Sequence, residues 1–215
     1  MTVHFIGSDT LSGVKTITSD LIISTEGASQ SVVGTATDKA DNSASTTVTG
    51  INIDKTPPSV TISSPGNGTE YILKQTILAA WSANDSLSGL YSATGTVASG
   101  QAIDTGIVGA KNFNVAATDK AGNQISQSVG YKVIYNYGGI LPPIKGDGSS
   151  VFKLGSTVPV KFQLKDAGGS FVGTATARII MQKLNNNVPS GDSIIPESTS
   201  SASIGNLFRY DTTEN

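Results

Sequence analysis

Four oxygen-bearing side chains in this sequence could hold a metal ion if the fold brought them together: Asp54, Asp85, Asp119 and Asn123. Calcium favours about six to eight oxygen ligands, which carboxylates, amide oxygens and backbone carbonyls can supply. Three aspartates held close without a cation would also repel one another. The competing hypothesis is that Asp85 and Asp119 only accept backbone hydrogen bonds within turns.

Residues suited to catalysis are scarce. His4 is the only histidine, cysteine is absent, and the glutamates are scattered at positions 26, 70, 197 and 214. No Ser-His-Asp triad and no histidine-based metal site can be assembled from this set. A carboxylate pair for glycoside hydrolysis stays formally open, although the aspartates fall in turn-rich segments. We therefore expect a protein that is not an enzyme.

The composition narrows the choice of partners. The net charge is −2, and the two arginines, Arg178 and Arg209, cannot form the cluster that binding to a phosphate backbone requires. No apolar run approaches the roughly 20 residues that span a bilayer. We expect no nucleic-acid partner and no membrane insertion by this segment.

Two stretches of the sequence recur in the same order. Asp9–Val14 matches Asp85–Leu90, and Ala36–Asn42 matches Ala117–Asn123. The offsets differ by about five residues (85 − 9 = 76; 119 − 38 = 81), which a surface loop can absorb. A period near 80 suits one repeated β-sandwich module.

Alternating apolar residues predict half-buried antiparallel strands in the second copy. We expect Trp81, Phe113, Val115 and Val133 to be buried in one core, because each lies on the apolar face of its strand. Glycine, proline, asparagine and aspartate separate the strands. The predicted strands contain Val60 and Ile62, residues 77–81, residues 113–117 and residues 129–133.

Paired prolines mark two boundaries, within 54–58 and within 137–143. They divide the chain into a partial module at 1–54, a complete module at 55–137 and a partial module at 138–215. For the third module the sequence predicts strands over 158–164 and 175–181, a long loop over 185–203 and a return of apolar residues at 207–210.

These motifs resemble known families. Residues 117–123, with the boundary at 54–58, are similar to the bacterial and archaeal immunoglobulin-like repeats of large surface proteins. Residues 155–162 (GSTVPVKF), with 206–211, resemble the PxKF domain found at the end of such arrays. The resemblance implies an all-β fold of tandem immunoglobulin-like antiparallel β-sandwiches.

The resemblance also indicates two incomplete modules. Phe5 falls opposite Trp81, so the first module lacks its opening strand, and the third stops before its closing strands. The chain would then be an excerpt of a longer protein. A subunit that is completed by a strand from a neighbouring copy would look the same.

The expected sandwich gives the four ligand candidates a common location. The loop after the second strand and the last hairpin lie at the end where the first strand enters. Asp85 and Asp119 should therefore face the linker that carries Asp54, with Asn123 beside them. This predicts calcium at the first junction. At the second junction Asn136 takes the place of Asp54 and brings no charge.

We expect a non-catalytic spacer of an extracellular or cell-surface repeat protein, whose partners are the neighbouring modules and, through strand exchange, further copies of the chain. A ligand-binding adhesin region and the accessory modules of a secreted hydrolase stay open, with a virion surface module as a third alternative. Tyr135 and Tyr137 could stack on a ligand or pack at the second junction. Asn67 and Asn84 match the N-glycosylation pattern.

Overall fold

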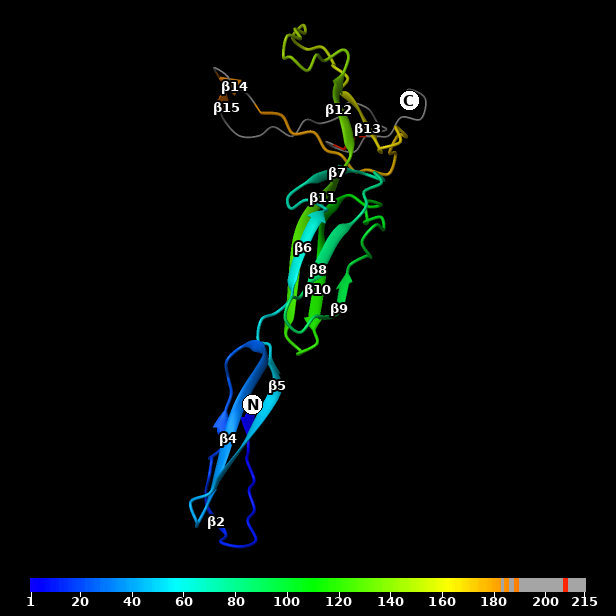
Figure 1. Ribbon diagram of the computed structural model, residues 1–215. Coiled ribbons are helices and arrows are strands. Elements are labelled where there is room, and N and C mark those ends of the chain that lie inside the picture. Colours follow the sequence, from blue (N-terminus) through cyan, green and yellow to red (C-terminus); the bar gives the residue numbers. More distant parts are fainter. Residues whose placement is uncertain (183, 186–187, 190–206, 209–215) are drawn as a thin grey trace. The chain divides into compact units, whose positions relative to one another are not determined.

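The computed structural model describes residues 1–182, 184–185, 188–189 and 207–208. Every regular element among them is a β-strand, and no helix is present in this part of the chain (Figure 1). The chain forms two compact units. The first comprises residues 1–69, 77–103 and 110–131, and the second comprises 70–76, 104–109 and 132–215. The module boundaries drawn from the sequence stay a prediction.

The first unit begins with two antiparallel sheets. Strand β1 (Thr2–Val3) pairs with β3 (Leu21–Ile22), and the second sheet has the order β2-β4-β5. Its long hairpin turns at residues 38–42. The buried cluster of this region consists of Val3, Phe5, Ile23 and Ile51. The strands of the second sheet are β2 (Val14–Ile17), β4 (Gly27–Asp38) and β5 (Ser43–Ile53).

The rest of the first unit repeats this pattern. Strand β6 (Ser59–Ser64) pairs antiparallel with β8 (Ala80–Asn84). A second sheet contains β9 (Leu90–Gly95), β10 (Gly109–Asp119) and β11 (Gln124–Ile134), which runs into the second unit. Strand β10 alternates between buried and exposed residues, as a strand with one face on a core does. Two pairs of facing sheets are consistent with a β-sandwich.

Burial confirms most of the predicted strand faces. Phe113, Val115 and Val133 are almost completely buried. Trp81 is only half-buried, so the prediction that it is buried in one core with these residues is wrong in degree. Its indole Nε1 donates a hydrogen bond to the backbone oxygen of Val97 at 2.9 Å, which holds the ring at the edge of the apolar region.

The second unit contains the remaining strands. Strand β7 (Glu70–Ile72) pairs in parallel with residues 132–134 of β11. Strand β12 (Asn136–Leu141) pairs antiparallel with β13 (Lys161–Lys165). The ring of Phe162 contacts the rings of Tyr137 and Phe208 edge-on, with centroids 6.0 and 4.6 Å away.

The sequence predicted a strand over 175–181 and a long loop over 185–203 in this unit. The predicted strand over 175–181 is wrong: this stretch forms isolated bridges, such as that of Arg178 with Leu207. Its alternating positions include alanines, which bury little apolar surface and so do little to fix a strand. Most of the predicted loop over 185–203 lies outside the described residues. The short strands β14 (Leu184–Asn185) and β15 (Val188–Pro189) pair at its beginning.

The close packing of Trp81 on Gly95 generates a stability prediction. A Cβ added at Gly95 would lie 2.6 Å from the indole Nε1 and 2.7 Å from the oxygen of Val97. Gly95→Ala should therefore lower the free energy of unfolding by about 1–3 kcal/mol. Urea titrations followed by the fluorescence of Trp81, the only tryptophan, measure this change.

The matched control is Gly138→Ala, because a Cβ at Gly138 meets no atom within 4 Å. This variant should unfold like the parent or at slightly higher urea. Equal stability of the Gly95→Ala variant and the parent would contradict the packing described for Trp81.

Candidate metal centre

Asp85 closes the loop that directly follows β8. Its Oδ1 accepts hydrogen bonds from Leu87 N at 3.2 Å, Ser88 Oγ at 3.4 Å and Gly89 N at 2.6 Å. The other carboxylate oxygen, Oδ2, takes no hydrogen bond within the described part of the chain. Asp85 therefore forms the turn expected of an aspartate and still presents one oxygen outward.

Asp119 closes the hairpin between β10 and β11. Its Oδ1 accepts a hydrogen bond from Asn123 N at 2.8 Å, and its Oδ2 accepts one from Asn123 Nδ2 at 2.7 Å. The side chain of Asp119 is only 1% exposed. A buried carboxylate needs hydrogen bonds or a cation to offset lost hydration, and here Asn123 supplies the hydrogen bonds.

Asp54 belongs to the linker ahead of β6. Its Oδ1 accepts a hydrogen bond from Thr56 N, and its Oδ2 accepts one from Ser88 N, each at 3.0 Å. The hydrogen bond with Ser88 is the main reason that the pKa of Asp54 lies below its ordinary value. The linker carboxylate thus stays ionised and reaches the loop that Asp85 closes.

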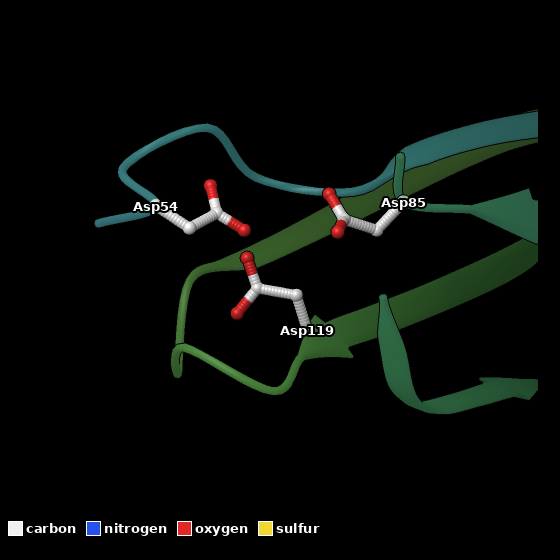
Figure 2. Close-up of side chains that lie close together, drawn as sticks. All are labelled: Asp54, Asp85 and Asp119. Atoms are coloured by element: carbon white, nitrogen blue, oxygen red, sulfur yellow. The ribbon is translucent and has the colours of Figure 1, made fainter. Parts of the chain in front are cut away.

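The three carboxylates converge. Asp54, Asp85 and Asp119 each offer one oxygen, and these oxygens lie within 4.8 Å of one another. Figure 2 shows the carboxylates directed toward a common centre from the linker, the loop after β8 and the end of β10. No lysine or arginine of the described residues forms an ion pair with any of them.

This spacing suits a calcium ion. Two oxygens that both contact Ca²⁺ at about 2.4 Å can be at most about 4.8 Å apart. Further oxygens would have to come from backbone carbonyls or water. Among the described residues, these aspartates are the only group of three or more His, Cys, Asp or Glu side chains close enough to share an ion.

Asn123 stands beside the carboxylates but faces them with its Nδ2. That nitrogen donates to Asp119 and also to the backbone oxygen of Asp54 at 3.3 Å. In this orientation Asn123 fixes the hairpin to the linker and offers the centre no oxygen. Its expected part as a ligand stays a prediction that needs the amide to turn over.

The first sequence copy repeats these hydrogen bonds without the third acid. Oδ1 of Asp9 accepts from the backbone of Leu11 and Gly13 and from Ser12 Oγ, as Asp85 does in its own loop. Asp38 accepts from Asn42 N and Nδ2, both at 2.9 Å. The pair of Asp9 and Asp38 therefore provides an internal comparison for the three-aspartate centre.

A third hairpin of the same kind has a cation of its own. Asp166, at the turn after β13, accepts hydrogen bonds on Oδ1 from Gly168 N and Ser170 N. Its Oδ2 pairs with the ammonium of Lys74 at 3.0 Å, and the carboxylate is almost completely buried. The hydrogen bond with Lys74 lowers the pKa of Asp166, and that with Ser170 adds to the effect.

Within the described part of the chain, the other residues singled out from the sequence do not gather around a second centre. His4 pairs with Asp20 at the surface. Tyr137 is half-exposed and contacts Phe162, so it takes part in packing. Asn67, a candidate for glycosylation, accepts a hydrogen bond from Gly130 N. Sequence reasoning missed Ser88 and Lys74.

No family model matches the chain, and no curated protein matches it significantly. Among the described residues, no helix is long and apolar enough to cross a membrane.

The centre predicts a calcium response. Adding Ca²⁺ at a hundred times its dissociation constant should stabilise the full chain by about 2.7 kcal/mol. Asp85→Asn should abolish this response, because the amide keeps the Oδ1 acceptor and removes the charge. In chelator the same variant should melt higher than the parent, since one repelling carboxylate is gone. Melting followed by Trp81 fluorescence measures both effects.

Asp9→Asn is the matched control, because Asp9 makes the same loop hydrogen bonds outside the centre. This variant should keep the calcium response. Parent melting curves that superimpose with calcium and with chelator would leave the three aspartates as turn formers.

The third hairpin predicts a pH response. Because the folded pKa of Asp166 lies below its unfolded value, its contribution to stability is complete above the unfolded pKa of about 3.9. This contribution is lost as the pH falls through the folded pKa. Lys74→Met should raise the pKa of Asp166. NMR titration of the Asp166 carboxyl carbon in parent and variant checks it, and identical midpoints would show that Lys74 does not act on Asp166.

Proposed function

We propose that this chain is a non-catalytic spacer from an extracellular or cell-surface protein, built of tandem immunoglobulin-like modules with a PxKF-like module at its C-terminal end. Calcium at Asp54, Asp85 and Asp119 stiffens the first joint. The observation that carries the proposal is the linker at residues 54–58, which is hydrogen-bonded to the elements before and after it.

On the side of the preceding strands, Lys55 holds the linker. Its backbone N donates to Glu26 Oε1 at 2.9 Å, and its ammonium donates to the backbone oxygen of Ser24. Glu26 and Ser24 lie just ahead of β4. A flexible tether would leave these groups to water, whereas here they restrict the linker.

On the side of the following strands, Asp54 and Pro58 fix the linker. Asp54 accepts from Ser88 N and, through its backbone oxygen, from Asn123. Pro58 is completely buried, and its ring restricts the backbone where β6 begins. A cation bound by Asp54, Asp85 and Asp119 would join the linker to two further loops through ionic bonds. This arrangement suits a spacer, which must keep its modules in line.

The loop and hairpin that carry Asp85 and Asp119 form a corner that recurs around Asp9 and Asp38, which supports a tandem repeat. The backbone N of Lys39 donates to the oxygen of Gly13 at 3.0 Å, and that of Lys120 donates to the oxygen of Gly89 at 2.9 Å. Together with the matching aspartate hydrogen bonds, this gives one local structure in both sequence copies. Surfaces rich in serine and threonine with few charges are in keeping with an extracellular location.

The test measures the stiffness of the joint. The chain has no cysteine, so Thr49→Cys and Ser128→Cys, both at exposed strand positions, place two spin labels without further changes. Pulsed dipolar spectroscopy of the full chain should give a narrow distance distribution in Ca²⁺. Adding Asp54→Ala should broaden it, because this change removes a ligand and the hydrogen bonds to Thr56 and Ser88.

Asp41→Ala is the control, since Asp41 is exposed and pairs with Lys15 away from the linker. This variant should keep the narrow distribution. A broad distribution in the parent, unchanged by calcium, would describe a flexible tether and would refute the proposed spacer.

A further inference from the structure

The segment His4–Ser8 is the counterpart of strand β8 in the first sequence copy. Moving each residue of β8 (Ala80–Asn84) back by the offset between Asp85 and Asp9 (85 − 9 = 76) gives residues 4–8. The neighbouring pairing agrees with this alignment. Thr2 pairs with Ile22, and Leu78, which is 76 residues after Thr2, forms a bridge with Ala102.

Strand β8 and the segment His4–Ser8 differ in whether one backbone edge is paired. Strand β8 is paired with β6, in a register that places Val60 opposite Ala83 and Ile62 opposite Trp81. The segment His4–Ser8 pairs with no strand in the part of the chain that the structure describes. Its backbone groups are therefore available to an added strand.

A groove runs beside this edge. It has a volume of about 370 Å³ and is lined by Phe5 and by residues of β2, β4 and β5, including Val14, Ile17, Ala36 and Ala44. Phe5 belongs to the buried cluster, so the groove is continuous with the core of this region. The phenyl ring lies directly on Gly34, where a Cβ would come within 2.3 Å of it.

Strand β6 shows what such a groove would take. Val60 and Ile62 are half-buried, while Ser59, Thr61 and Ser63 are exposed. Transferred by the same offset, Val60 would lie opposite Gly7 and Ile62 opposite Phe5. Two β-branched side chains would then enter the groove on alternate positions, as strand periodicity requires.

The contacts of the linker ahead of β6 also have an equivalent position in the first copy. In the second copy Asp54 contacts the loop of Asp85 and the hairpin of Asp119. The equivalent loop and hairpin of the first copy carry Asp9 and Asp38, and Leu11 in that loop is 97% exposed. An extended segment that fills the groove would bring an aspartate to this corner as well.

We propose that the edge His4–Ser8 and its groove are an acceptor site for an antiparallel strand with the sequence pattern of residues 54–64, an aspartate followed by Lys-Thr-Pro-Pro and an alternating Ser-Val-Thr-Ile-Ser-Ser strand. The occupant is a separate segment of this pattern and not the β6 of a second copy, because β6 is already paired with β8 within its own chain. The proposal goes beyond the spacer function and does not require calcium.

The test places such a segment in position. Because residue 77 aligns with Met1, a copy of residues 54–76 fused directly ahead of Met1 in the full chain supplies the strand in the register seen for β6 and β8. The amides of Ile6 and Ser8 should face the added strand, because Trp81 N, the counterpart of Phe5 N, points away from β6 and donates to Ser99 Oγ. Hydrogen exchange of these two amides should slow at least tenfold in the fusion. The matched control carries aspartate at the fused counterparts of Val60 and Ile62, and its amides should exchange as in the unfused chain.

Two outcomes would overturn the proposal. One is equal exchange of the Ile6 and Ser8 amides in the fusion and its charged control, while the amides of β10 stay protected in both and so show that the chain is folded. The other is a dimer of the unfused chain in analytical ultracentrifugation with the Ile6 and Ser8 amides already protected, which would make a second copy the occupant.

Discussion

The structure depends on aspartates that close hairpins and loops through their own carboxylates. In each case Oδ1 accepts backbone hydrogen bonds from the residues that follow, as for Asp85, Asp119 and Asp166. The turn can then form without a glycine at every position and without a large core. The same hydrogen bonds fix the direction of Oδ2, and an ionised oxygen held at a partly buried corner needs a partner.

The identity of that partner differs from one corner to the next. Asp166 Oδ2 has the ammonium of Lys74, whereas Asp119 Oδ2 has the amide Nδ2 of Asn123 and two more carboxylates nearby. Both arrangements contain a nearly buried aspartate in the same turn. One is neutralised within the chain, and the other gathers the charge that a divalent cation would neutralise. This contrast separates the centre from an ordinary group of acidic turn residues.

The sequence was sufficient to predict the convergence of the three aspartates because it contains a repeat. Two matching motifs required one local structure, and sandwich connectivity places its loop and hairpin at one end. Ser88 was missed, although its counterpart Ser12 lies in the same motif, because a backbone N donor leaves no mark in the side-chain pattern. Lys74 was missed because it lies 92 residues from Asp166, a distance over which no local rule applies.

The fold could be predicted from the sequence to about the same extent as the group of three aspartates. Alternation in β10 and β11 correctly predicted that Phe113, Val115 and Val133 lie on buried faces, because the burial of large apolar side chains fixes the register of a strand. Alternation failed at residues 175–181, where alanines contribute little apolar surface. It also overstated Trp81, whose polar nitrogen draws the ring toward Val97. Periodicity predicts a face, whereas hydrogen-bonding groups on the side chain decide how deeply it is buried.

Hydrogen bonds within the chain already order the loop of Asp85 and the hairpin of Asp119. The carboxylates of Asp85 and Asp119 are oriented by their own turns, so a bound cation would not have to order these loops. Asp9 and Asp38 are oriented in the same way and have no third acid beside them among the described residues. The variable component is therefore the linker residue. Asp54 adds the third carboxylate at the corner of Asp85 and Asp119, and Ser88 N holds it there through a hydrogen bond at 3.0 Å. The two corners share the same aspartate hydrogen bonds, so the linker carboxylate is what separates a group of three aspartates from a pair.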